Sequence, residues 1–130
     1  MKISEAFNSF NAKQKNIQWS VSAINQNNEL VLSLWKHFFK SKSTDTMTYT
    51  DHASRWKGPG NSEFRRLFEK ANSENLVVRA IIAKSKQPNV IINGGAGSNL
   101  GNTFHPKPNW IGEITRWDGE HFEIEFRSEL

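Results

Sequence analysis

Ser54-Arg55-Trp56-Lys57-Gly58-Pro59-Gly60-Asn61 is the stretch around which the rest of the sequence can be organised. Its Gly-Pro-Gly core predicts a turn, and Asn61 or Ser62 is suited to cap a helix that starts after it. The N–H groups of the first helical turn would then face solvent, where they could bind an anion. The arginine and the lysine add positive charge beside them, and the tryptophan adds a flat ring. We call residues 54–61 the basic turn and treat it as a candidate binding site.

The clearest helix and the clearest buried strand both follow the basic turn. Apolar residues recur at helical spacing after it and form one stripe: Phe64, Leu67, Phe68 and Ala71. Charged residues between them, including Arg65 and Arg66, are expected on the outer face of this helix. Residues 76–83 are almost continuously apolar, which is typical of a central strand that is covered on both faces.

Upstream of the basic turn the sequence predicts a helix, a hairpin and a strand. Apolar residues at helical spacing predict a short amphipathic helix over residues 3–12: Ile3, Ala6, Phe7 and Phe10. Residues 46–51 alternate and are rich in β-formers, so they are expected to form a strand that ends just before the basic turn.

Residues 18–24 and 30–34 alternate around a polar loop rich in asparagine, which predicts the hairpin. With Ile24 opposite Glu29, the large apolar residues of both strands share one face. Residues 29–39 also have helical spacing, and a helix there is the competing interpretation. The hairpin register explains more residues.

Residues 36–42 mix three lysines with a histidine and two phenylalanines. This composition is typical of grooves that bind single-stranded nucleic acid, where rings stack on bases and lysines neutralise phosphates. The structural alternative is that Phe38 and Phe39 are one core residue and one partly exposed residue of the fold.

Residues 84–109 differ in character from the rest of the chain. Residues 90–92 can form a short strand, and the glycine-rich residues 93–103 are expected to form a mobile loop. This segment lacks the Gly-Lys-Ser/Thr ending of a nucleotide-binding P-loop, so we reject that interpretation. It is either a functional lid or a plain surface loop.

The Asp-Gly dipeptide at residues 118–119 predicts a tight type I′ turn between the last two strands. With the flanking residues paired, Glu113 falls on the apolar side of this hairpin, where a carboxylate needs a cation or hydrogen-bond donors. Arg79, the lone charge in residues 76–83, is the expected partner. The two residues form either a structural ion pair or the lining of a pocket that binds a small molecule or a nucleotide.

Length and composition narrow the class of protein. The 130 residues are enough for a single domain, residues 1–130, with one core. The absence of cysteine excludes disulfides and cysteine-based zinc sites and suits a reducing cytoplasm. The four histidines are not spaced as metal ligands, and no apolar run reaches the roughly 18 residues of a membrane span. We expect a cytoplasmic protein that has no metal or other cofactor and no contact with a membrane.

Positive charge is unevenly distributed along the chain. Residues 1–109 contain 15 Lys and Arg and 7 Asp and Glu, which gives this segment a net charge of +8. Residues 110–130 contain 2 Lys and Arg and 6 Asp and Glu, which gives a net charge of −4. A basic body suits a protein that meets phosphate, although excess lysine also keeps small proteins soluble. The candidate nucleic-acid or anion site comprises the basic turn and the cations expected near it: Arg55, Trp56, Lys57, Arg65, Arg66, Lys84 and Lys86.

Together the elements predict an α+β fold, a strongly bent, mostly antiparallel sheet or partial barrel of about five or six strands with two helices packed on it. This order of elements resembles the compact PUA-like barrels, the pseudouridine-synthase-associated and modified-base-reading domains, which implies binding of RNA or DNA. Residues 54–61 and the phrase Asn-Trp-Ile-Gly-Glu-Ile at residues 109–114 are similar to small bacterial proteins encoded on mobile gene cassettes of the integron type. That second resemblance implies no particular activity.

The first functional hypothesis is therefore a non-enzymatic module that binds DNA or RNA through the basic turn. A pocket around Glu113 and Arg79 is the second, and self-association into a dimer through an exposed Trp110 and the last hairpin is the third. Because no nucleophile elbow, ordered triad or paired carboxylates can be recognised, an enzyme is the less favoured interpretation.

Overall fold

The computed structural model describes residues 1–94 and 101–128 of the chain. The α-helices in this part are α1 (Ile3–Asn8), α2 (Gly58–Glu74) and α3 (Pro88–Ile92), and the short 3-10 helices are η1 (Lys36–Phe38) and η2 (Ala53–Arg55). The strands are β1 (Ser22–Ile24), β2 (Leu30–Trp35), β3 (Phe39–Ser43), β4 (Thr46–His52), β5 (Val78–Lys84), β6 (Thr103–Pro106), β7 (Trp110–Trp117) and β8 (His121–Ser128).

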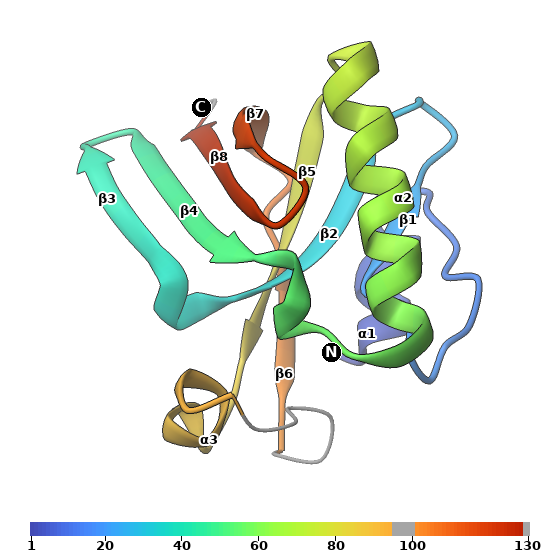
Figure 1. The fold of residues 1–130 in the computed structure, drawn as a ribbon, viewed down its shortest axis with the longest axis vertical. Coiled ribbons are helices and arrows are strands. Elements are labelled where there is room, and N and C mark those ends of the chain that lie inside the picture. The colour runs from blue at the N-terminus through green and yellow to red at the C-terminus, as the bar shows by residue number, and fades with distance from the viewer. Residues whose placement is uncertain (95–100, 129–130) are drawn as a thin grey trace.

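All eight strands belong to one bent sheet, with neighbours in the order β1-β2-β5-β7-β8-β4-β3 and with β6 paired to β5 (Figure 1). β2 and β5 run parallel, and the other pairs are antiparallel. The sheet is not closed into a barrel. The α+β class with a mostly antiparallel sheet is thus confirmed, but the described residues form eight strands and three α-helices instead of the expected five or six strands and two helices.

The core has two parts, one on each face of β2 and β5. On one face the α2 stripe that contains Phe64 and Phe68 packs on alternate residues of both strands, and on the other face α1 packs on Val31 and Ile81. Each of these phenylalanines is fully buried and contributes about 2 kcal/mol through removal of its apolar surface from water. The prediction that residues 76–83 form a central strand covered on both faces is confirmed.

The first hairpin forms, but its register differs by one residue from the expected one. Ile24 pairs with Leu30 rather than with Glu29. Asn25 lies opposite Glu29 instead and closes the loop with two hydrogen bonds. Its N–H donates to the carbonyl of Glu29 at 3.0 Å, and its side-chain oxygen accepts the N–H of Glu29 at 2.8 Å. Asn28, with φ of 59°, lies in the loop of residues 25–29, which is one residue longer than predicted. The asparagine side chain therefore sets the register.

α2 begins four or five residues earlier than the sequence predicts. Lys57 is its N-cap residue, so Gly-Pro-Gly forms the first turn of the helix instead of preceding it, and Asn61 does not cap it. Proline suits this turn because the first N–H groups of a helix have no partner within it. Gly60 is required here, because a Cβ would lie 2.7 Å from the carbonyl oxygen of Trp19. The side chain of Asn61 instead donates to a carbonyl of η2 at 2.7 Å.

Two elements that precede the basic turn in the sequence also differ from expectation. α1 ends at Asn8, before the predicted limit at residue 12, because the chain turns at Asn11 with φ of 58°. Residues 39–43 form the edge strand β3, which pairs with β4 and extends the sheet beyond the predicted third strand.

The segment after β5 is helical where a strand was expected. Pro88 opens α3, so residues 90–92 lie in a helix. Of the glycine-rich loop predicted at residues 93–103, residues 95–100 lie outside the described residues, and Thr103 already begins β6.

The turn of the last hairpin is longer than the predicted Asp-Gly turn. Trp117 pairs with Phe122, so four residues lie between the paired residues instead of two. The Asp118 carboxylate holds this longer turn, because it accepts the backbone N–H groups of Glu120 at 2.9 Å and His121 at 2.6 Å.

A β-bulge then changes the faces of β7. The register shifts between Ile114 and Arg116, and such an extra residue moves the preceding side chains to the opposite face of the sheet. Glu113 is consequently exposed and lies opposite Glu125, so its predicted place on the apolar side is wrong. Gly112 takes that place beneath Phe126.

Candidate functional site

Arg55 of the basic turn is committed to the interior of the protein. Its Nε lies 2.7 Å from Oδ1 of Asp51, whose side chain is only 1% exposed. Its Nη1 donates to the carbonyl of Ile91 at 2.8 Å, and its guanidinium lies 4.2 Å from the centre of the Phe38 ring. Burial and the nearby Asp51 carboxylate raise the pKa of the Tyr49 phenol, which donates to Asp51 at 2.8 Å. These partners leave Arg55 little freedom to bind phosphate.

A chain of hydrogen bonds leads from Arg55 to the surface. Nη2 of Arg55 lies 3.4 Å from Nε2 of His52, and Nδ1 of His52 lies 3.0 Å from Oγ of Ser54. Because arginine can only donate, this arrangement assigns the His52 proton to Nδ1. The Ser54 hydroxyl then donates to Glu120 at 2.8 Å. His52 thus donates to Ser54 instead of accepting its proton, which is the wrong arrangement for an activated serine nucleophile.

Arg65 is also held by partners within the protein. Its Nη2 lies 2.9 Å from Oε1 of Glu120, and its guanidinium donates to the carbonyl of Gly119 and to Asn61. The hydrogen bond from the Ser54 hydroxyl, with further contributions from the Ser54 N–H and Arg65, holds the pKa of Glu120 below its usual value. Glu120 therefore links the basic turn to the last hairpin.

The other candidate residues in and near the basic turn, Trp56, Lys57 and Arg66, have different surroundings. Trp56 is half-buried, and its ring stacks on Phe64 with a centroid separation of 4.5 Å. Lys57 and Arg66 are exposed and form no ion pair within the described part of the chain. Lys57 and Arg66 are therefore accessible to a ligand, but the Trp56 ring beside them is not freely exposed.

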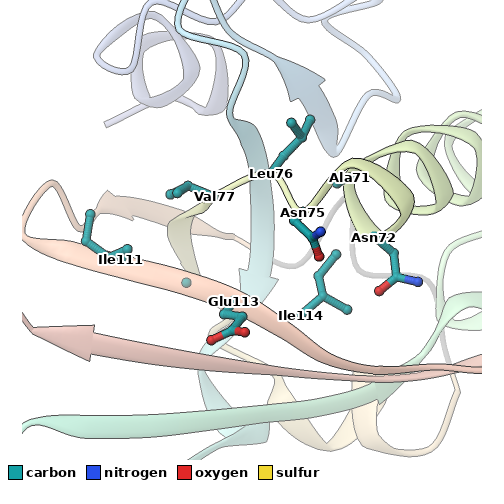
Figure 2. A pocket seen from close by; sticks show the side chains of 9 residues that line it. Ala71, Asn72, Asn75, Leu76, Val77, Ile111, Glu113 and Ile114 are labelled. Carbon is teal, nitrogen blue, oxygen red and sulfur yellow. The ribbon is translucent and has the colours of Figure 1, made fainter.

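The expected ion pair between Glu113 and Arg79 is not formed. Arg79 lies 2.9 Å from Glu29 and also donates to the carbonyl of Trp110 at 3.2 Å. The cause is the bulge in β7, which places Glu113 on the outer face of the hairpin. Glu113 does line a pocket, beside the C-terminal end of α2, but Arg79 is not among the residues that surround it (Figure 2).

A second group of cations gathers where the parallel strands β2 and β5 end. The chain continues from β2 into Lys36 and His37 and from β5 into Ser85, and these residues line a pocket of about 350 Å³ together with Lys84 and Pro88. Ligands of sheets with parallel strands commonly bind at the carboxyl ends of those strands. The Ser85 hydroxyl accepts the N–H of Gln87 at 2.9 Å, so its own proton is free to be donated.

β6 brings more positive charge to the same end of the molecule. Lys84 and Thr103 pair across β5 and β6, and the stem of Lys86 lies against Gly101. Burial lowers the pKa of the His105 imidazole, and so do four positive charges around it: Lys84, Lys107, the amino terminus and Lys36. We call the group Lys36, His37, Lys84, Lys86, His105 and Lys107 the lysine-rich end. The end of β5 lies toward the bottom of Figure 1, with β6 and α3.

The lysines of this end are not neutralised by the protein. Lys36, Lys84, Lys86 and Lys107 make no ion pair with any residue that the structure describes. Partly exposed rings lie among them: Trp35 and His37 stack with centroids 6.3 Å apart, and Lys107 lies 5.8 Å from the Trp110 ring. Burial, followed by the charge of Arg55, lowers the pKa of His37.

Sequence reasoning found this site only in part. Lys84 and Lys86 were expected beside the basic turn, and residues 36–42 were recognised for their mixture of cations and rings. His105 and Lys107 were missed, although their alternation in the extended Phe-His-Pro-Lys-Pro segment is a visible sign that both could project from one strand.

Other site classes find little support in the described residues. No group of His, Asp or Glu side chains there is placed to hold a metal ion. None of the helices in that part is both long and apolar enough to cross a bilayer. No protein-family model, curated protein or solved structure matches the chain. The two cationic regions and the two pockets are therefore the candidate sites of this protein.

Proposed function

We propose that this protein binds single-stranded nucleic acid through its lysine-rich end. The observation that carries the proposal is the pocket at the ends of β2 and β5, to which each strand delivers one unpaired lysine, Lys36 and Lys84. Two ammonium groups and a free hydroxyl proton from Ser85 are all hydrogen-bond donors. A site with this composition favours an anion, and phosphate is the anion that a nucleic acid presents.

The size of the site supports a nucleotide unit. A volume of about 350 Å³ falls within the range of pockets that hold small organic ligands, roughly 300–1,000 Å³. Lys86 and Lys107 extend the positive surface beyond the pocket, along β6. A strand could therefore place one nucleotide in the pocket and its neighbouring phosphates along these lysines.

Partly exposed rings favour a single strand over a duplex. Trp35, His37 and Phe104 are each half-buried and lie at or beside the lysine-rich end. Bases stack on such rings when they are not already stacked in a duplex, and each such contact contributes about 1–3 kcal/mol. A duplex would offer the same phosphates but no accessible base faces.

Binding can be measured by fluorescence anisotropy with a labelled 12-nucleotide single strand, in RNA and DNA form, and with the matching duplex. The logarithm of the affinity should fall with the logarithm of salt concentration with a slope of about −2.8 if each of the four lysines neutralises one phosphate, because each neutralised phosphate of a single strand contributes about −0.7. The duplex should bind more weakly. The absence of saturable binding at low salt would overturn the proposal.

A matched pair of variants locates the site. Lys36→Ala/Lys84→Ala should weaken binding about tenfold at low salt, because two phosphate contacts are lost. Lys57→Ala/Arg66→Ala removes the same charge from the basic turn and the outer face of α2 and should change the affinity less than about twofold. Equal losses in the two variants would mean that net charge, and not the lysine-rich end, determines binding.

A further inference from the structure

A second pocket lies where the sheet opens between β5 and β7. The two strands pair only through Val78 and Gly112. The residues just before Val78 no longer follow β7, because they connect β5 to the end of α2. The gap is a pocket of about 320 Å³ (Figure 2). Its apolar walls include Leu76, Ile111 and Ile114, and its polar groups are the side chains of Asn72, Asn75 and Glu113.

The charge at this pocket is negative. Glu113 is exposed and has no hydrogen bond or ion pair with any of the described residues. It also lies directly opposite Glu125, and like charges in that position repel each other. Glu125 is neutralised by Lys42 at 2.7 Å and Arg127 at 3.6 Å, whereas Glu113 receives no such partner.

The end of α2 adds to this negative field. The helix ends at Glu74, and Asn75 follows as its C-cap residue in the left-handed conformation, with φ of 54°. The C-terminal end of a helix carries a partial negative charge. Figure 2 shows Asn72 and Asn75 at this end, beside Ile114, with Glu113 on the strand below them. The arginine that could have neutralised the site, Arg79, is held by Glu29.

We infer that this pocket binds a small organic cation, an amine or amidinium group carried on an apolar body. The apolar body would pack against lining residues such as Leu76 and Ile111, and the cationic head would bind the Glu113 carboxylate. One carboxylate among apolar walls provides too few oxygen ligands for a divalent metal ion. This site is separate from the lysine-rich end and does not depend on nucleic-acid binding.

Benzamidine is a suitable probe, because it joins an amidinium to a small ring. In a titration followed by 15N–1H correlation spectra of the whole chain, we expect saturable shifts of the backbone amides of Asn75, Gly112 and Glu113. Benzoate, with the same ring and the opposite charge, should produce no saturable shifts at these amides. Shifts by benzoate at the same concentrations, or no saturation by benzamidine, would overturn the inference.

Three variants test the role of the carboxylate. Glu113→Gln should weaken benzamidine binding about fivefold, the effect of one exposed ion pair of about 1 kcal/mol. Glu74→Gln removes a nearby carboxylate that does not line the pocket and should change the affinity less than about 1.5-fold. Asn72→Lys places an ammonium group at the pocket and should abolish binding. Equal affinity of the wild-type chain and Glu113→Gln would overturn the inference, and an unchanged correlation spectrum outside the pocket shows that each variant is folded.

Discussion

Arg55 and Arg65 of the basic-turn region each bind a carboxylate, Asp51 or Glu120, whereas Lys36 and Lys84 of the lysine-rich end bind none among the described residues. Both regions are cationic in sequence. The arginines use their planar, multivalent donors to join η2, α2, α3 and the last hairpin, which is the kind of pairing that guanidinium groups suit. The lysines keep their charge directed to solvent. Positive charge therefore serves structure in one region and is available to a ligand in the other.

The largest expected effect is a loss of stability when the ion pair between Arg55 and Asp51 is broken. Asp51→Ala leaves Arg55, whose side chain is 11% exposed, without its counter-charge, and it removes the acceptor of the Tyr49 hydroxyl. The free energy of unfolding, measured by urea denaturation and tryptophan fluorescence, should fall by about 3 kcal/mol.

Lys70→Ala is the control for this variant, because it breaks the exposed pair with Glu74. Its effect should stay below about 0.5 kcal/mol. If Asp51→Ala cost no more than this control, Arg55 would not be committed to the interior, and the contrast between the two regions would fail.

A charge reversal in each region compares their roles in binding. Lys84→Glu should weaken the affinity for a single-stranded oligonucleotide about tenfold at low salt, because it replaces an attraction to phosphate by a repulsion. Lys57→Glu makes the same change at the start of α2 and should weaken it less than about threefold. Anisotropy titrations of both variants at one salt concentration provide the measurement, and the reverse order of effects would assign binding to the basic turn.

A smaller effect is expected from pH at the lysine-rich end. The pKa of His105 is lowered by burial and by the lysines around it, so its imidazole is neutral at pH 7.5. Bound phosphate raises that pKa, and proton uptake then accompanies binding. The affinity should rise roughly threefold between pH 7.5 and pH 5.5, and His105→Gln should flatten the profile. An unchanged profile in His105→Gln would place the titrating group elsewhere.

The smallest expected effect concerns the turn of the last hairpin, in which Glu120 accepts hydrogen bonds from Ser54 of the basic turn. Hydrogen bonds from the backbone N–H groups of His121 and then of Glu120 lower the pKa of Asp118 from 3.8 to about 2. A depressed carboxyl pKa contributes stability that is fully present well above pH 3.8 and is lost as the pH falls through 3.8 toward 2.

The stability of the wild-type chain and of Asp118→Ala should therefore differ by a constant amount above about pH 5 and converge as the pH falls toward 2. Urea midpoints measured across this pH range test the prediction. A difference that persists at pH 2 would show that the charge of Asp118 is not what holds the turn.

Elements with strong local patterns could be predicted from the sequence, whereas their pairing could not. The α2 stripe, the β4 alternation and the apolar run of β5 each depend on neighbouring residues, and these predictions are confirmed. The registers of both hairpins depend on single residues, the Asn25 side chain in one and the bulge at Thr115 in the other. A change of one residue exchanges the faces of a strand, so Glu113 moved from the core to the surface.

The candidate site shows the same division. Lysines and rings in residues 36–42 and at Lys84 and Lys86 could be recognised by their composition, since charge and aromatic content are properties of the chain itself. Their meeting at one end of the sheet could not, because it requires β2 and β5 to run parallel and β6 to fold back on β5.

By itself, the sequence of this protein determined its class, its basic character and the location of its main helix and central strand, because these depend on composition and on local periodicity. Only the tertiary structure decided which cations are free. Arg55 and Lys36 carry the same charge, but Asp51 is fixed beside Arg55 by β4 and η2, and no carboxylate of the described chain is fixed beside Lys36. The partner of a charge is set by contacts between distant segments, and the local pattern of residues does not contain them.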